Sequence, residues 1–103
     1  LTVITKGAEG ALFTSPAATI MSPAAKATVV DTIGAGDSYM AALILCLLTR
    51  STEGFPPAVM EALGHTAAAA AAITVQRAGA NPPTLDELNS ALETPTSSYH
   101  TIK

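Results

Sequence analysis

Two long apolar segments constrain the fold of this chain most strongly. Residues 35–50 and 58–76 have the composition of helices, and both are apolar on nearly every face. Helices of this kind are buried on more than one side. A chain of 103 residues can bury one modest core, but it has difficulty covering two such helices completely. The sequence therefore predicts a real hydrophobic core that belongs to a larger fold.

Short β-rich segments precede these helices. Residues 1–5 are largely apolar and rich in β-formers, which predicts a buried strand. Residues 6–10 contain two glycines and predict a turn. Further strands are predicted at 11–15 and 18–22, as a hairpin around Pro16, and at 28–30. Strands followed by helices predict an α/β fold in which the helices cover a sheet.

A third helix is indicated near the C-terminus. Thr84 and Glu87 have the spacing of a capping box, in which both side chains satisfy free backbone N–H groups at a helix start. This helix is expected to end near Glu93. The Ser/Thr-rich residues 94–103 are expected to form a flexible tail, so the predicted domain spans residues 1–93.

Charge, cysteine content and hydropathy exclude several classes of protein. The formal net charge is −3 with no run of basic residues, which argues against binding to nucleic acid or to an anionic membrane. The single cysteine, Cys46, lies in an apolar run, so we expect a core residue and a reducing compartment. The apolar run 40–48 is about half as long as a membrane span, and no signal-peptide pattern is present. These features predict a cytoplasmic protein.

The stretch Gly34-Ala35-Gly36-Asp37 begins the first long segment. The first N–H groups of a helix lack internal partners, and the helix dipole adds partial positive charge there. Because glycine lets a ligand approach the backbone closely, residues 34–36 predict a cradle for an anion such as phosphate. A carboxylate repels phosphate, but Asp37 can serve as the base for a hydroxyl that attacks a bound phosphate.

The same residues also have a simpler interpretation. An aspartate in the first turn complements the helix dipole, and Gly-Ala-Gly can be an ordinary tight turn. Other motifs do not fit, because a dinucleotide fingerprint needs glycine where Tyr39 stands, and the Gly-Lys-Ser/Thr of a Walker loop is absent. There is also no Gly-x-Ser-x-Gly of an esterase. Tyr39 is interpreted as a packing residue.

A longer string, residues 30–42, closely resembles the C-terminal signature of the ribokinase-like (PfkB) carbohydrate kinases, Asp-Thr-x-Gly-Ala-Gly-Asp followed by small and apolar residues. Residues 5–10 look like the family's Thr-x-Gly-x-x-Gly nucleotide loop. Residues 67–79 look like its alanine-rich helix and the following Arg-x-Gly-Ala turn. The resemblance covers about residues 1–93, and it implies the C-terminal part of a Rossmann-like α/β/α fold.

The resemblance implies an ATP-dependent kinase of sugars or nucleosides, with Mg²⁺ accompanying the nucleotide. Asp37 would be the catalytic base, and Gly34, Ala35 and Gly36 the anion hole. Some ribokinases carry a polar or imidazole side chain where this chain has Ala68, and His65, one turn earlier, is interpreted as a histidine near the surface or bonded to a neighbour. The residues expected to bind ATP are Thr5, Lys6, Gly7, Ala8, Glu9, Gly10, Gly36 and Ala68.

The resemblance also implies a monovalent cation, potassium, beside the anion hole. Carbonyl dipoles in a fixed ring can replace the water around this large cation. Pro83 argues against the site, because some ribokinases offer a serine hydroxyl there. The alternative is that Asp31 only caps a turn through its own backbone. The expected ligands are the carboxylate of Asp31 and the carbonyls of Ile33, Thr74, Arg77 and Gly79.

The resemblance leaves the substrate open. The N-terminal portion of the family carries most sugar-binding residues, so fructose or ribose is expected on family frequency alone. The chain begins in a strand at Leu1, which suggests a piece of a larger protein. The alternative hypothesis is a truncated product that binds nucleotide or a partner chain without catalysis, although the intact Asp37 argues against a decayed site. A homodimer of the full-length protein remains open.

Overall fold

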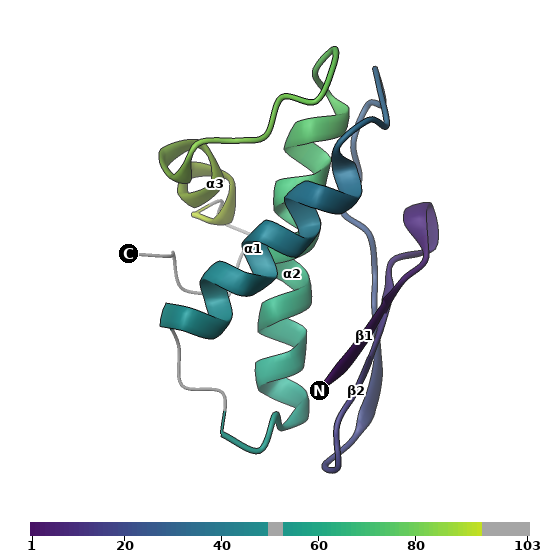
Figure 1. Ribbon diagram of the computed structural model, residues 1–103, viewed down its shortest axis with the longest axis vertical. Helices are drawn as coiled ribbons and strands as arrows, with labels where there is room; N and C mark the ends of the chain where they lie inside the picture. Colours follow the sequence, from purple (N-terminus) through teal and green to yellow (C-terminus); the bar gives the residue numbers. More distant parts are fainter. Residues whose placement is uncertain (50–52, 94–103) are drawn as a thin grey trace.

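The computed structural model describes residues 1–49 and 53–93. A short sheet lies along one side of the molecule, and the helices all lie on the same side of it (Figure 1). The predicted tail, 94–103, lies outside the described residues. The elements are β1 (Thr2–Thr5), the 3₁₀ helix η1 (Gly7–Glu9), β2 (Ala11–Thr14), β3 (Thr19–Ser22), α1 (Ala35–Thr49), α2 (Pro57–Val75) and α3 (Leu85–Leu92).

The sheet is an antiparallel meander in the order β1-β2-β3. Side chains alternate between the two faces of a strand. Ala11 and Phe13 of β2 point into the core and are fully buried. On the opposite face Ile4, Leu12 and Met21 are paired in register across the three strands. Ile4 and Met21 are half exposed, so this face presents an apolar surface.

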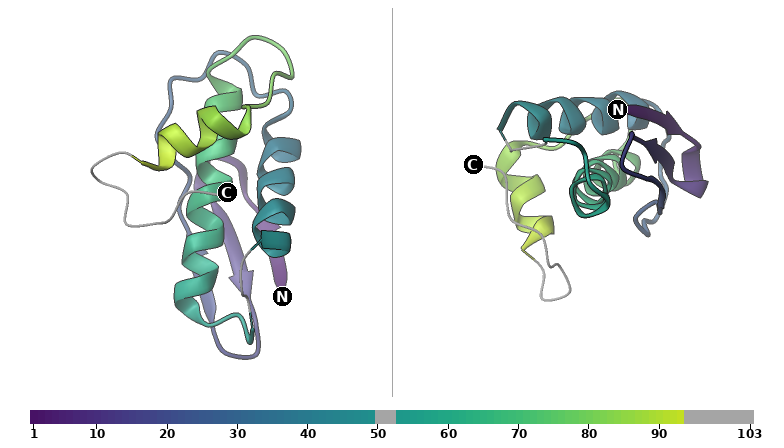
Figure 2. Two further views of the ribbon diagram at one scale, coloured as in Figure 1. Left: turned by 90° about the vertical axis from the view of Figure 1, so that its left-hand side faces the viewer. Right: turned by 90° about the horizontal axis from the view of Figure 1, so that it is seen from below.

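The central helix is α2, which contacts α1, α3 and β3 (Figure 2). A close approach of the sheet is possible because position 64 is glycine. A Cβ at Gly64 would lie 2.0 Å from Oγ of Ser22 and 3.3 Å from the ring of Phe13. By length and hydropathy alone α2 could cross a membrane. Here its apolar faces are instead covered from several sides, as the composition of residues 58–76 predicts.

Helix α1 is buried on one side only, in agreement with the expectation that this chain cannot cover both apolar helices completely. Tyr39, Cys46 and their neighbours on the same face pack into the core, with Cys46 fully buried and Tyr39 8% exposed. Both residues therefore have the packing role that the sequence predicts. The opposite face of α1 exposes the apolar side chains of Met40, Ile44, Leu47 and Leu48.

Two predicted strands differ from the structure. Residues 1–5 contain β1, but its residues are mostly exposed because β1 is an edge strand with β2 as its single partner in the described chain. Residues 28–30 do not form a strand. The N–H groups of Val30 and Asp31 instead donate to the carbonyl of Val75, over N···O distances of 2.7 and 3.1 Å. The end of α2 therefore supplies the partner that a neighbouring strand would have provided.

The exposed apolar face of α1 predicts that this 103-residue chain self-associates and has low solubility. We expect light scattering after size exclusion to give a mass above that of a monomer. Substituting Ile44→Lys and Leu48→Lys together should shift the mass toward the monomer. Lysines at two exposed polar positions, Thr14 and Ser90, form the matched control and should leave it unchanged. A monomer with sharp, well-dispersed amide NMR signals for the unmodified chain would contradict the prediction.

Candidate active site

The Gly34–Asp37 stretch forms the last turn before α1 and its first residues. Gly34 has φ +84°, a conformation that favours glycine. The N–H of Ala35 donates to the carbonyl of Thr32 at 3.3 Å. Within residues 1–49 and 53–93, the N–H groups of Gly34, Gly36 and Asp37 have no hydrogen-bond partner. The free backbone donors of the predicted cradle are therefore those of Gly34, Gly36 and Asp37, whereas the N–H of Ala35 is engaged.

The cradle faces open space. A Cβ built on Gly36 would meet no atom within 4 Å. The Asp37 side chain is exposed, and it lies in the first turn of α1 beside the free N–H groups. Free donors at the positive end of a helix can bind an anion, and an adjacent exposed carboxylate can accept a proton from a group that approaches that anion.

The C-terminal end of α2 and the loop that follows it pack against the turn at Gly34. A Cβ on Gly34 would lie 3.1 Å from Cβ of Ala80 and 3.7 Å from the methyl carbon of Thr74. Asp31, three residues before Gly34, also binds this region, through the N–H of Gly79. The structure therefore places Thr74 and Ala80, which are distant in sequence, directly against the predicted anion hole.

Asp31 joins the turn before α1 to the loop after α2 through both of its carboxylate oxygens. Oδ1 accepts from the N–H of Ile33 at 3.0 Å, and Oδ2 accepts from the N–H of Gly79 at 3.0 Å. These bonds, with that from Ile33 first, lower the pKa of Asp31. The turn cap that the sequence offers as an alternative is therefore present, together with a contact to Gly79. The carbonyls of Thr74 and Gly79 also accept from N–H groups two or three residues later, those of Arg77 and Asn81.

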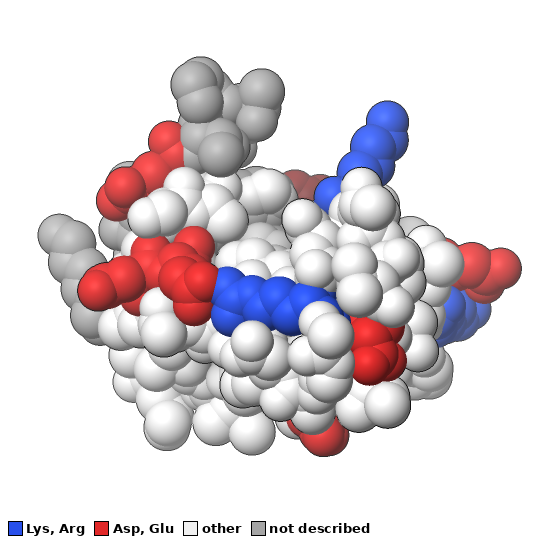
Figure 3. All heavy atoms as spheres, turned by 90° about the horizontal axis from the view of Figure 1, so that it is seen from above, with Lys and Arg blue, Asp and Glu red and all other residues white. Residues whose placement is uncertain are grey.

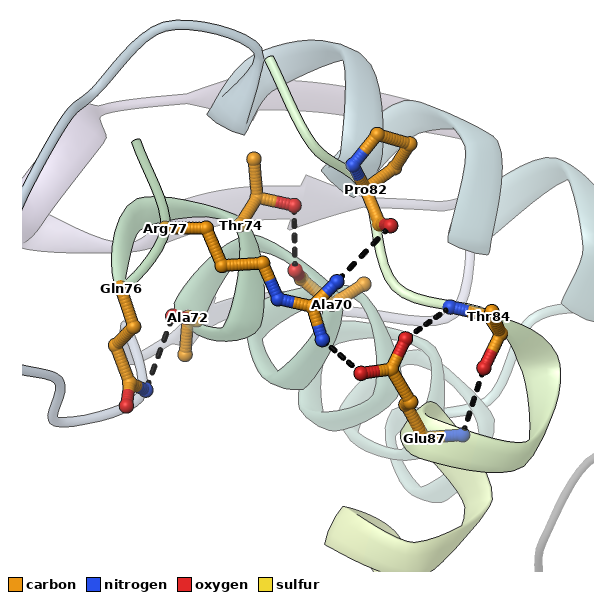
Figure 4. A network of polar contacts seen from close by, with 8 residues as sticks. All are labelled: Ala70, Ala72, Thr74, Gln76, Arg77, Pro82, Thr84 and Glu87. Carbon is orange, nitrogen blue, oxygen red and sulfur yellow. Dashed lines mark hydrogen bonds and ion pairs between the residues drawn. The ribbon is translucent and has the colours of Figure 1, made fainter. Parts of the chain in front are cut away.

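Arg77 holds the loop between α2 and α3. Its guanidinium donates to the carbonyl of Pro82 at 3.3 Å and pairs with the carboxylate of Glu87 (Figure 4). Glu87 also accepts from the N–H of Thr84 at 2.9 Å, and Thr84 Oγ1 accepts from the N–H of Glu87. The predicted capping box is thus confirmed. The Thr84 N–H, followed by Arg77, lowers the pKa of Glu87.

Basic and acidic side chains alternate on this end of the molecule. Seen from above, basic groups lie between acidic ones, and this face carries no continuous basic surface among the described residues (Figure 3). The side chain of Arg77 is engaged by Glu87, so its predicted contribution to a cation site would come from its backbone alone.

The predicted nucleotide loop, residues 5–10, is a closed turn that contains η1. The N–H of Lys6 donates to the carbonyl of Gly10 at 2.7 Å, and the N–H of Gly10 donates to the carbonyl of Gly7 at 3.0 Å. Gly10 has φ +94°, and a Cβ there would lie 2.1 Å from the carbonyl oxygen of Ser22. Sequence reasoning missed this packing role of Gly10. The side chains of Thr5, Lys6, Ala8 and Glu9 are exposed.

A cavity of about 350 Å³ lies next to this loop. Ser22, Pro23 and Ala24, which contact Gly10, form part of its wall. Ala68 of α2 also lines it, so the structure brings two parts of the predicted ATP site to one region. The full lining is Met21, Ser22, Pro23, Ala24, Ala25, Glu61, His65 and Ala68.

Glu61 and His65 of this cavity were not predicted as site residues. His65 lies four residues after Glu61, and Ala68 lies three residues after His65, so all three share one face of α2. That spacing was the signal available in the sequence. Burial lowers the pKa of His65.

Comparisons with known proteins agree with this architecture. Residues 1–87 match the pfkB family carbohydrate kinase. Aminoimidazole riboside kinase of Salmonella typhimurium is 35% identical over 92 residues, which are 88% of this chain and 28% of that protein. Fructokinase of Rhizobium leguminosarum bv. trifolii is 47% identical over 47 residues, 46% of this chain and 14% of that protein.

A solved structure places the elements in the same arrangement. Ribokinase of Thermotoga maritima superimposes with a TM-score of 0.71 at 32% identity, covering 88% of this chain and 29% of that protein. The chain therefore spans less than a third of the length of these relatives, and its sheet and helices form a partial domain of the ribokinase fold. The sequence match and the shared arrangement together show that this chain belongs to the pfkB family of carbohydrate kinases.

Proposed function

We propose that this chain is the C-terminal, nucleotide-binding part of a kinase that transfers the γ-phosphoryl group of ATP to a hydroxyl of a sugar or nucleoside. The observation that carries the proposal is the set of free N–H groups on Gly34, Gly36 and Asp37 beside the exposed Asp37 carboxylate. Preorganised donors stabilise charge that develops on the transferred group. These free donors and the neighbouring carboxylate support the assignment of an anion hole and a base for this reaction.

The chemical step follows from these positions. The acceptor oxygen attacks the γ-phosphorus while Asp37 takes its proton, and the bond to the β-phosphate oxygen breaks to release ADP. The N–H groups of Gly34, Gly36 and Asp37 hold the oxygens of the transferred group. Mg²⁺ neutralises phosphate charge when bound with the nucleotide. The described residues contain no group of three or more His, Cys, Asp or Glu that could hold a metal.

We assign the rest of the nucleotide to the loop at residues 5–10 and to the neighbouring cavity. Its volume of about 350 Å³ lies within the range of small-molecule sites. Ala68 leaves room for a flat base, and the exposed Lys6 can approach the phosphates. We place the reaction in the cytoplasm, where ATP is available and a lone cysteine such as Cys46 stays reduced.

The test is an ATP-consumption screen of the full-length protein that contains this chain. The panel holds fructose, ribose, aminoimidazole riboside and a set of nucleosides. We expect ADP to form with one class of acceptor and not with ATP alone. Binding of ATP without turnover on the whole panel would instead support a catalytically silent binding module.

Potassium is expected to raise turnover several-fold over sodium. Asp31 already joins Ile33 to Gly79, so its charge lies where a cation would hold the anion-hole turn in shape. The measurement compares rates in potassium, sodium and a bulky ammonium salt at equal ionic strength. Asp31→Asn should reduce the difference between the salts. Equal rates in the three salts would show that the chain has no potassium site and that Asp31 acts only as a turn cap.

A further inference from the structure

Two buried hydroxyls connect the first turn of α1 to the end of α2. Oγ of Ser38 lies 2.6 Å from Oγ1 of Thr74, and Thr74 Oγ1 donates to the carbonyl of Ala70 at 3.1 Å. Ser38 is 5% exposed and Thr74 is fully buried. A hydroxyl has one proton to donate. Because Thr74 gives its proton to Ala70, Ser38 must donate to Thr74, and the two bonds form a chain with one direction.

This chain ends at the proposed anion hole. Ser38 follows Asp37, and its N–H donates to the carbonyl of Gly34 at 2.9 Å. The methyl group of Thr74 lies against Gly34, while its hydroxyl binds Ser38. One side chain of α2 therefore lies beside Gly34 at one end of the cradle and binds Ser38, which follows its other end.

We propose that Thr74 is a positioning residue whose hydroxyl, through Ser38, sets the place of Asp37 and of the free N–H groups of Gly34 and Gly36. The inference rests on the proposed function of that site. Burial alone does not explain the arrangement. Thr66 is also fully buried on α2, and its hydroxyl has no hydrogen-bond partner among the described residues. A buried threonine on this helix thus does not have to form such a chain.

The test compares matched variants of the full-length protein. Thr74→Val removes the hydroxyl and keeps the shape, so we expect kcat to fall about 10- to 100-fold, because small displacements of reacting groups are costly. The KM for ATP should change little. Thr74→Ser keeps the hydroxyl and should restore most of the rate. Thr66→Val makes the same chemical change but removes no hydrogen bond among the described residues, so its kcat should equal that of the wild type.

A double-mutant cycle tests whether the hydroxyls act as one unit. Ser38→Ala and Thr74→Val together should lower kcat no further than either alone, because both remove the same bond. Additive losses, or a Thr74→Val enzyme that turns over like Thr66→Val, would overturn the proposal.

Hydrogen exchange provides a readout that does not need turnover. Thr74→Val should speed exchange of the Ser38 amide, whereas Thr66→Val should leave it unchanged. Unchanged exchange at Ser38 in Thr74→Val would overturn the positioning role. If the wild-type protein phosphorylates no acceptor, the proposed function fails, and the exchange experiment still decides whether Thr74 holds the turn.

Discussion

Replacement of Asp37 by asparagine in the full-length protein is expected to lower kcat about 10²- to 10⁴-fold, which is the usual contribution of a general base. Asparagine keeps the size of the side chain but cannot take the proton of the acceptor hydroxyl. The Asp37 side chain is exposed and forms no hydrogen bond or ion pair with the described residues, so its replacement should preserve the fold at a cost of no more than about 1 kcal/mol. ATP affinity should stay the same or increase, because a charge that repels phosphate is lost. Steady-state kinetics and calorimetric titration with ATP measure both quantities.

Asp86 provides the matched control for this prediction. It is also an exposed aspartate in the first turn of a helix, α3. A role limited to the helix dipole contributes about 0.3–1 kcal/mol to stability at either position. If Asp37→Asn and Asp86→Asn had the same small effect on turnover, Asp37 would be a helix-start residue and not a base.

Gly36→Ala is expected to preserve the fold and to lower kcat about 10²-fold or more, as the loss of one anion-hole donor does in other enzymes. A Cβ at this position meets no atom of the chain and lies in a helix, where alanine is preferred over glycine by about 1 kcal/mol. The methyl group would instead occupy the space through which a phosphate reaches the free N–H groups. Thermal unfolding and kinetics of the same preparation separate the two effects.

Gly34→Ala is the informative comparison. Its φ of +84° and the proximity of Ala80 make an alanine strained, at about 1–3 kcal/mol, so this variant should lose both stability and activity. Full activity of Gly36→Ala with unchanged stability would show that no ligand approaches the backbone there. The simpler interpretation, an ordinary tight turn, would then hold.

Local sequence determined the elements themselves. The helices begin and end within one residue of their predicted limits where the structure describes them, and the hairpin strands do so likewise. The Thr84–Glu87 capping box was predictable because its bonds join residues three apart. The free N–H groups at the start of α1 were predictable for the same reason, since they follow from the helix alone. The family followed from motifs that are each local, at residues 5–10, 30–42 and 67–79.

Tertiary structure decided which surfaces are buried and what supports the site. Residues 28–30 have the composition of a strand, but their backbone binds the end of α2, because no strand edge of the described chain lies beside them. The apolar composition of α1 could not reveal that only its Cys46 face is covered. Contacts of Gly10 with Ser22, of Asp31 with Gly79 and of Ser38 with Thr74 join residues 12, 48 and 36 positions apart. Such contacts depend on how the elements pack in space, which no local pattern of residue types encodes.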